Sequence, residues 1–141
     1  MAGDNPMWKV DPSKEEIGVL MEAGIVYRDL RDFEAARDVF NGVQALLPKS
    51  DAVHVALGTV SFQEGDFESA DRHYRLALQL NPRSAYACAH LAELEIFRAN
   101  PEKAKAHVRE AIRLDPRGPS GKFARSLLEM IEAPQSEKTT G

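Results

Sequence analysis

Four histidines and one cysteine are the residues of this 141-residue chain best suited to bind a transition metal. A metal site needs such ligands at short, defined spacings, as in HxxxH or HExxH on one helix face. His73 and His107 are instead 34 residues apart, and His54 and His90 occur in no such motif. We therefore expect no metal and no other cofactor, and we interpret the four histidines as side chains of the surface or of a groove.

Residues that could catalyse a reaction also lack a recognisable pattern. The chain contains no GxGxxG, GxxxxGK or GxSxG motif, which would indicate a phosphate-binding loop or a serine nucleophile. The acidic residues fall mainly on the polar faces of expected helices, so no isolated carboxylate pair is available for acid–base catalysis. Cys88 stands in the small-residue stretch AYACAHLAE, where we expect it to pack rather than to react. The sequence therefore predicts a protein that is not an enzyme.

The composition excludes several other classes of function. A formal net charge of −4 provides no excess of cations with which to displace counterions from nucleic acid. No apolar run is long enough to cross a bilayer, so direct membrane insertion is not expected. The first residues, MAGDNPMWKVDPSKEE, contain neither the cationic nor the apolar region of a secretory signal peptide. We therefore expect a cytoplasmic protein.

A 34-residue repeat organises the chain and must position whatever site it has. The stretches VQALLPKS, ALQLNPRS and AIRLDPRG end three successive blocks, 17–50, 51–84 and 85–118. Small residues recur at the eighth and twentieth positions of each block, and large apolar residues recur at the twenty-fourth. These recurring residues are Gly24, Gly58 and Ala92, then Ala36, Ala70 and Ala104, then Phe40, Tyr74 and Val108.

Local signals divide each block into two helices joined by a tight turn. In the second block we expect helices over 51–64 and 67–80. Gly65 provides a left-handed stop between them, and Asp66 is the expected cap of the second helix. That helix is expected to end at Asn81, because the residue before a proline avoids the helical conformation.

The other blocks begin their helices with related signals. In the third block, Asn100 and Pro101 are expected to replace the Gly-Asp turn, as a cap followed by proline in the first helical position. The first block uses Asp32 as the cap of its second helix. Ser13 and Glu16 form a capping box for the first helix of all. Six helices, paired in three hairpins, follow from these signals.

A seventh helix is expected over residues 119–133, after Gly118 and with Ser120 as its cap. A stacked array needs such an end, because its last hairpin would otherwise expose an apolar face. We expect the segment 1–16 to be partly flexible and the polar tail 134–141 to be disordered. The apolar stripe of the seventh helix comprises Phe123, Leu127, Met130 and Ile131.

The repeat resembles the tetratricopeptide repeat (TPR). The second block carries Leu57-Gly58 and the turn GDFESA, and the first carries Gly24 and Tyr27 at the positions where this family has its motif. The third block departs from the motif at Glu95, where an aromatic residue is usual. Over residues 17–118 the resemblance implies an all-α fold: three helix-turn-helix repeats in a right-handed superhelical array, with a C-terminal capping helix. Such arrays present a concave groove.

The resemblance also indicates which residues line the groove, and most of them are apolar. An apolar groove suits an extended apolar segment or an amphipathic helix of a partner protein. For Phe62, Ile96 and Phe97, packing between hairpins is the alternative. The expected partner-binding residues are Met21, Ile25, Arg28, Val55, Thr59, Phe62, Tyr86, Glu93, Ile96 and Phe97.

Two sub-families of tetratricopeptide proteins give different expectations. Co-chaperones of the heat-shock chaperones bind an acidic tail through lysine, asparagine and arginine, and here the matching residues are Met21, Ile25, Ala56, Tyr86 and His90. We therefore expect no such clamp. The stretches GIVYRDLRDFEAARDVFNGVQALLP and HLAELEIFRANPEKAKAHV are similar to repeats of bacterial type III secretion chaperones. Translocator chaperones of that kind dimerise with the help of a longer N-terminal helical segment than the 16 residues found here, so self-association is left open.

The leading hypothesis is a non-enzymatic protein-binding module, in its most specific form a type III secretion chaperone. The alternative is a structural assembly subunit that docks through its hairpin ends or convex face. Trp8, the only tryptophan, also has two interpretations. Either it packs over the exposed side of the first helix as an N-terminal cover, or Met7, Trp8 and Val10 enter a groove as an occluding or partner-binding segment.

Overall fold

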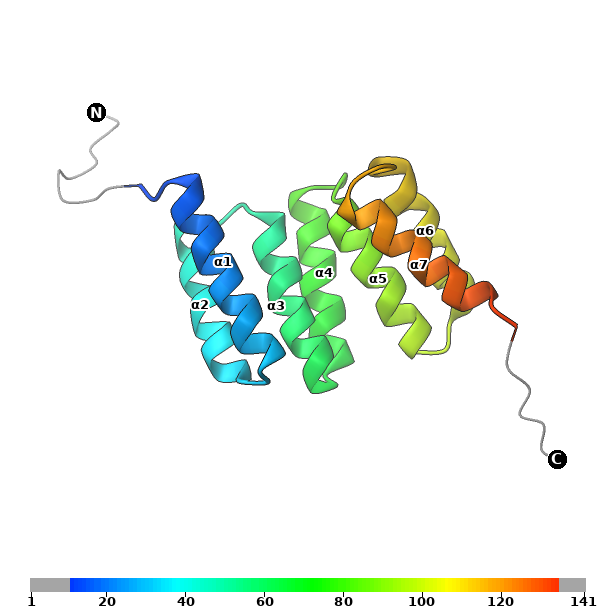
Figure 1. Cartoon of the computed structure of the whole chain (residues 1–141), viewed down its shortest axis with the longest axis horizontal. Coiled ribbons are helices and arrows are strands. Elements are labelled where there is room, and N and C mark those ends of the chain that lie inside the picture. Colours follow the sequence, from blue (N-terminus) through cyan, green and yellow to red (C-terminus); the bar gives the residue numbers. More distant parts are fainter. Residues whose placement is uncertain (1–10, 135–141) are drawn as a thin grey trace. The chain divides into compact units, whose positions relative to one another are not determined.

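The computed structural model describes residues 11–134, and over this range it contains helices and turns but no strand (Figure 1). The described chain divides into two compact units, one up to Lys49 and one from Ser50. Trp8 and the tail after residue 134, for which we had expectations, lie outside the described residues. The helices are α1 (Lys14–Asp29) and α2 (Phe33–Leu46) in the first unit, and α3 (Asp51–Glu64), α4 (Phe67–Leu80), α5 (Ala85–Phe97), α6 (Pro101–Leu114) and α7 (Pro119–Glu132) in the second.

The first unit is a single helical hairpin. The predicted capping box is confirmed at the start of α1, where the Ser13 hydroxyl accepts from the Glu16 amide at 3.0 Å and the Glu16 carboxylate accepts from the Ser13 amide at 2.8 Å. Gly24 faces the buried ring of Phe40 on α2, and a Cβ at Gly24 would lie 2.6 Å from Cζ of that ring. The two helices therefore approach as closely as they do because position 24 has no side chain.

The second unit contains the other two hairpins and α7. Helices α3 and α4 have the predicted bounds, Gly65 between them is left-handed with φ of 86°, and Asp66 accepts a hydrogen bond from the Ser69 amide. Gly58 faces the fully buried ring of Tyr74, as Gly24 faces Phe40 in the first unit. A core joins the two hairpins of this unit. Its buried members are Val55, Ala70, Tyr74, Ala77, Ala87, Leu91 and Leu94.

The turn within each hairpin has the same backbone geometry. Arg31, Gly65 and Ala99, spaced 34 residues apart, all have positive φ, at 65°, 86° and 63°. The expectation that Asn100 and Pro101 replace the Gly-Asp pair was therefore wrong by one residue, because Ala99 takes the place of the glycine and Asn100 that of the aspartate. The repeat fixes the conformation of the turn even where the residue is not glycine.

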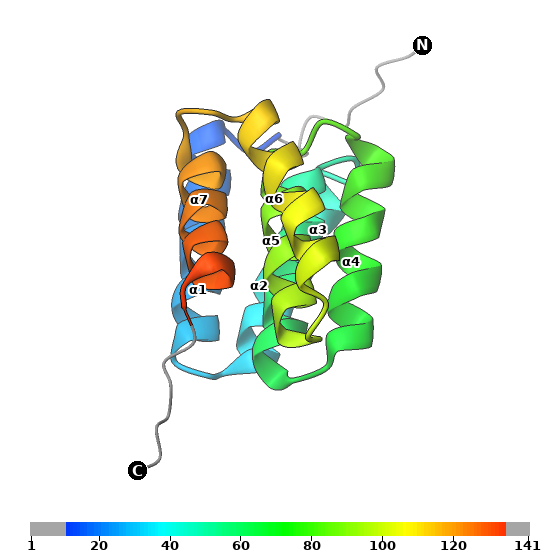
Figure 2. The ribbon, with the colours of Figure 1, turned by 90° about the vertical axis from the view of Figure 1, so that its right-hand side faces the viewer.

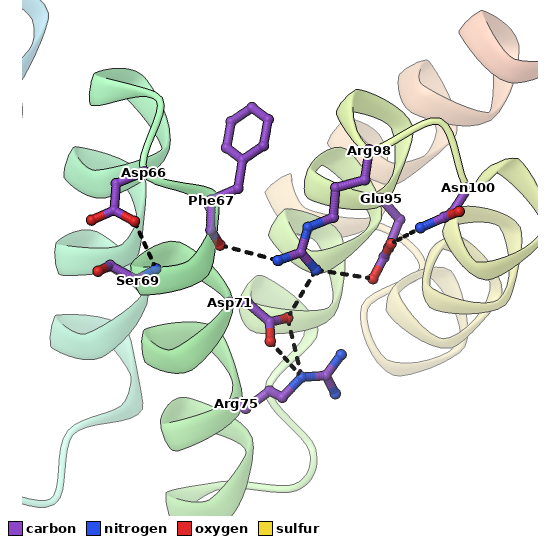
Figure 3. Close-up of polar contacts among 8 residues, drawn as sticks. All are labelled: Asp66, Phe67, Ser69, Asp71, Arg75, Glu95, Arg98 and Asn100. Carbon is purple, nitrogen blue, oxygen red and sulfur yellow. Dashed lines mark hydrogen bonds and ion pairs between the residues drawn. The ribbon is translucent and has the colours of Figure 1, made fainter.

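A polar network connects α4 and α5 of the second unit (Figure 3). Glu95 is only 2% exposed and accepts a hydrogen bond from the Asn100 amide group at 2.9 Å. The Arg98 guanidinium lies 3.7 Å from the carboxylates of both Glu95 and Asp71, and it also donates to the Phe67 carbonyl at 3.4 Å. Asn100 stands at the predicted N-cap of α6, but its side chain makes no capping bond because it is turned toward Glu95.

Helix α7 lies against α5 and α6 (Figure 2). We expected Ser120 to cap its N-terminus, but this prediction was wrong because Ser120 lies inside the helix. The Asp115 carboxylate caps it instead, accepting from the amides of Gly118 at 2.9 Å and Ser120 at 3.0 Å. Gly121 allows this loop to approach, since a Cβ there would collide with the Asp115 carbonyl.

The core under α7 confirms part of the predicted stripe. Leu127 is buried and Phe123 and Ile131 are partly buried, but Met130 is 58% exposed, and Leu128 packs inward in its place. Cys88 is buried in this same core, as expected. Burial, reinforced by the Glu110 carboxylate, raises the pKa of the thiol to about 11.

Candidate functional site

One face of α5 presents a row of ring-bearing and charged side chains at i, i+4, i+7 and i+11: Tyr86, His90, Glu93 and Phe97. We call this row the α5 stripe. The first three side chains are half-buried, and Phe97 is 58% exposed. Because this spacing repeats on one side of a helix, the stripe is a continuous surface along α5.

An aromatic cluster stands at the C-terminal end of the stripe. The ring of Phe97 meets the ring of Phe62 edge to face, with centroids 5.0 Å apart, and Phe62 stacks on Phe67 at 5.4 Å. Phe62 and Phe67 also pack on the core between the two hairpins. Phe97 is therefore held in place from one side and open to solvent on the other, which is the arrangement of a pre-formed apolar contact.

A pocket of about 320 Å³ lies at the other end of the stripe, between α5 and the start of α7. The His90 ring forms its centre, with centroids 5.1 Å from both Tyr86 and Phe123. His90 Nδ1 lies 3.1 Å from a Glu93 carboxylate oxygen, so the imidazole is oriented by its neighbour on the stripe. Such a pocket can hold an apolar side chain against three rings. It is lined by Tyr86, His90, Pro119, Ser120 and Phe123.

Three other residues expected in the groove of this unit have little or no accessible side chain on the stripe. Val55 is fully buried in the core. Thr59 is 4% exposed, and its hydroxyl donates to the Ala56 carbonyl at 2.7 Å. Ile96 is partly buried and packs on the core under α7. Their part in binding stays a prediction, and the surface considered below does not include them.

The expected residues of the first unit share one face of α1. Met21, Ile25 and Arg28 follow one another at helical spacing, and each is half-buried. The Arg28 guanidinium is 3.0 Å from the carboxylate of Asp29, so much of its charge is satisfied locally. These residues offer an apolar edge with one paired cation.

The structure adds three residues to the surface that the groove positions did not include. His90 could have been found from the sequence, because it is four residues after Tyr86 on the same helix. Phe67 and Phe123 could not, since they come from a second helix and from α7, to which the groove positions do not apply. Contacts between helices are needed to place them beside the stripe.

The histidines do not form a metal site in the part of the chain that the structure describes, where no three His, Cys, Asp or Glu side chains come close enough to bind one ion. We expected His54 at the surface or in a groove, but it is buried, with 8% of it exposed. Its ring stacks on that of His73 between α3 and α4, with centroids 5.9 Å apart. Burial lowers the pKa of His54 and, together with the nearby Arg75 guanidinium, that of His107.

Among residues 11–134, no helix is long and apolar enough to cross a membrane.

The family model described as "Tetratricopeptide repeat" matches residues 61–131, about half of the chain. The chain belongs to the tetratricopeptide repeat family. The resemblance drawn from the 34-residue period is thereby confirmed, and so is the all-α fold of helical hairpins. No curated protein matches the chain in sequence.

Solved structures of TPR proteins share the fold at low sequence identity. SycD of Yersinia enterocolitica, a type III secretion translocator chaperone, is 18% identical with a TM-score of 0.72, covering 86% of this chain and 92% of its own. PcrH of Pseudomonas aeruginosa, in complex with the chaperone-binding region of PopD, is 19% identical with a TM-score of 0.67 and coverages of 86% and 92%. Pseudomonas aeruginosa pilF is 23% identical with a TM-score of 0.73, covering 82% of this chain and 51% of its own. At these identities the likeness shows the fold.

Proposed function

We propose that this protein is a non-catalytic TPR module that binds a segment of another protein on the α5 stripe. The observation that carries the proposal is Phe97, a large apolar side chain that is 58% exposed yet fixed by ring contacts with Phe62 and Phe67. Single exposed apolar side chains are common on protein surfaces, but one that is fixed by contacts with other aromatic rings is suited to anchor a partner.

The chemistry of the stripe favours an apolar segment as the partner. Phe97 at one end and the pocket around His90 at the other give two places for apolar side chains of the partner. Between them stands the Glu93 carboxylate, 3.1 Å from His90 Nδ1, and a carboxylate at this point disfavours an acidic tail. Affinity would then come from apolar area removed from water, about 25 cal/mol for each Å².

The finer proposal is that the partner is a client of a secretion system. It is supported by SycD and PcrH, two proteins of similar length and fold, of which the second was solved with a region of its partner PopD bound. A chaperone for such a client would need the apolar surface that the stripe provides, because it must shield apolar client residues from aggregation.

The proposal is tested by charging the stripe at its exposed anchor. In Phe97→Glu, a carboxylate replaces the ring, and we expect the loss of about 2 kcal/mol or more of binding free energy, roughly a 30-fold weaker Kd. Met130→Glu is the matched control, because Met130 is exposed to the same extent, 58%, on the outer side of α7. Affinity-tagged wild type and both variants are purified from the native host, and co-purifying proteins are quantified by mass spectrometry.

The result that supports the proposal is one stoichiometric protein that is lost from Phe97→Glu and kept by Met130→Glu. Photo-crosslinking from benzoylphenylalanine at position 97 then identifies the segment bound, and an apolar secreted protein supports the secretion chaperone. Recovery of the same partner with both variants would refute binding at the stripe. Recovery of only further copies of this chain would favour the structural assembly subunit.

A further inference from the structure

Helix α1 of the first unit carries a second exposed apolar surface, which is separate from the α5 stripe. Val19 and Val26 of α1 and the C-cap residue Leu30 follow one another at i, i+7 and i+11, and they are 65%, 55% and 72% exposed. At the N-terminal end of this face, Val19 and Leu20 of α1 and Leu46 of α2 form the floor of an open cleft of about 630 Å³. Cavities of this size hold an aromatic side chain with room for its neighbours.

The rim of this cleft, which we call the α1 cleft, is acidic. The residues that line it beside the apolar floor are Asp11, Pro12, Glu15 and Glu16, and none of them is cationic. The Glu16 carboxylate is held in place because it accepts from the Ser13 amide in the capping box. The occupant that fits is therefore an apolar group next to a positive charge.

The chain itself carries such a group directly beside the cleft. Asp11 lines the cleft, and the residues before it read Met7, Trp8, Lys9 and Val10. Three peptide units join Trp8 to Asp11, so their Cα atoms can be at most about 11 Å apart. We propose that the segment 7–10 docks in the α1 cleft, with the Trp8 indole on the apolar floor and Lys9 near the acidic rim.

This docking would cover the start of the first hairpin, as α7 covers the last. In the second unit, Phe123 and Leu127 of α7 shield the core of the final hairpin. In the first unit, Val19 and Leu20 are exposed, and the apolar face of a terminal repeat needs such a cover. The acidic rim favours this occupant, which carries Lys9, over an acidic segment of a partner, which the carboxylates of the rim would repel.

The only tryptophan of the chain reports on the proposal directly, because all indole fluorescence comes from Trp8. In the full-length protein we expect an emission maximum shifted to the blue of N-acetyltryptophanamide, and acrylamide quenching several-fold weaker. Val19→Glu places a carboxylate in the floor of the cleft and is expected to return both values to those of the free amide. Val26→Glu is the matched control, since Val26 is similarly exposed on α1 but does not line the cleft.

Three results would overturn the proposal. Wild-type fluorescence and quenching equal to those of N-acetyltryptophanamide would show that the indole is in solvent. Protection that persists in Val19→Glu, with unchanged circular dichroism, would place the indole on another surface. Protection that appears only at concentrations where analytical ultracentrifugation detects a dimer would assign the cleft to a second copy of the chain. Protection that is independent of concentration and lost only in Val19→Glu supports the proposal.

Discussion

The close approach of the two helices within a hairpin makes a sharp prediction about one methyl group. A Cβ built on Gly58 would lie 2.7 Å from Cδ1 of Tyr74 and closer still to Cε1, and in the first unit a Cβ on Gly24 would meet the Phe40 ring in the same way. Both rings are fully buried. They cannot swing into solvent, so Gly58→Ala and Gly24→Ala must push the helices apart or distort the core.

The magnitude follows from two opposing effects. Overpacking of a rigid core costs about 1–3 kcal/mol, whereas alanine in a helix interior is favoured over glycine by about 1 kcal/mol. We expect a net destabilisation of about 1 kcal/mol for each variant. Gly42→Ala is the control, because Gly42 lies inside α2 with no atom within 4 Å of the added Cβ, and there only the favourable effect remains. It should stabilise the protein by about 0.5–1 kcal/mol.

Urea unfolding followed by far-UV circular dichroism measures these differences. With an m-value of about 1–3 kcal/mol/M, the midpoints of Gly58→Ala and Gly42→Ala should move in opposite directions and differ by about 1 M. Gly24 and Gly42 belong to the same hairpin, so their comparison holds even if the two units unfold separately. A midpoint for Gly58→Ala or Gly24→Ala at or above that of the wild type would refute the reasoning.

Four further predictions concern single residues of the second unit. Glu95→Ala leaves Arg98 without its buried partner and should cost about 2 kcal/mol in urea unfolding, whereas Glu95→Gln should cost less because the amide oxygen still accepts from Asn100. Ala99→Gly relieves the left-handed conformation and should stabilise by about 0.5–1 kcal/mol on the same assay; a loss would show that the turn is not strained. Because the pKa of Cys88 is raised to about 11, the thiol's contribution to stability is full below about pH 8.5 and is lost as the pH rises toward 11. Cys88→Ala should therefore flatten the alkaline part of the profile of unfolding free energy against pH. Ellman's reagent should react with the Cys88 thiol only when the protein unfolds. Because the pKa of His107 is lowered, the contribution of the neutral imidazole to stability is present above about pH 6.5 and is lost as the pH falls. His107→Gln should therefore reduce the fall in the urea midpoint between about pH 7 and pH 5. The same fall in the variant as in the wild type would contradict this role of His107.

The helices could be predicted closely because their signals are local. The bounds of α3 and α4 follow from caps and stops within a few residues of each end: Asp66, Gly65 and Asn81. The start of α7 at Pro119 was also predicted, but the residue that caps it was not. Its cap is Asp115, which reaches forward over the turn to the amides of Gly118 and Ser120, and only the folded loop brings these groups together. Helix ends that are capped from outside the helix are not visible in local patterns.

The candidate site was predictable to the extent that it follows one helix. Tyr86, Glu93 and Phe97 were expected because the family resemblance places them among the groove positions of the third block, and in the structure they lie on one face of α5. Thr59 satisfied the same rule on α3, yet it is buried and back-bonded to Ala56. Spacing therefore gives the face of a helix, but the depth of a side chain depends on what packs against that face. Phe123, which shapes the pocket, comes from a helix outside the repeat.

The third hairpin shows how the repeat keeps its backbone while its side chains change. The amides of Asp32, Asp66 and Asn100 donate to the carbonyls of Tyr27, Ser61 and Glu95, five residues earlier, at 2.9, 2.9 and 2.8 Å. The residue whose carbonyl accepts is thus aromatic in the first hairpin, small in the second and acidic in the third, and the backbone hydrogen bond is the same in all three.

The buried carboxylate of Glu95 does change the local polar contacts. Asn100 donates to it and leaves α6 without a side-chain cap, and Pro101 in the first helical position removes one of the amides that would have needed a partner. Glu95, Arg98, Asn100 and Pro101 therefore form one coupled set, and a substitution at any of them alters the environment of the others. The departure of Glu95 from the family pattern is accordingly a structural alternative, with its charge satisfied inside the second unit, and the partner-binding surface is better sought on the α5 stripe.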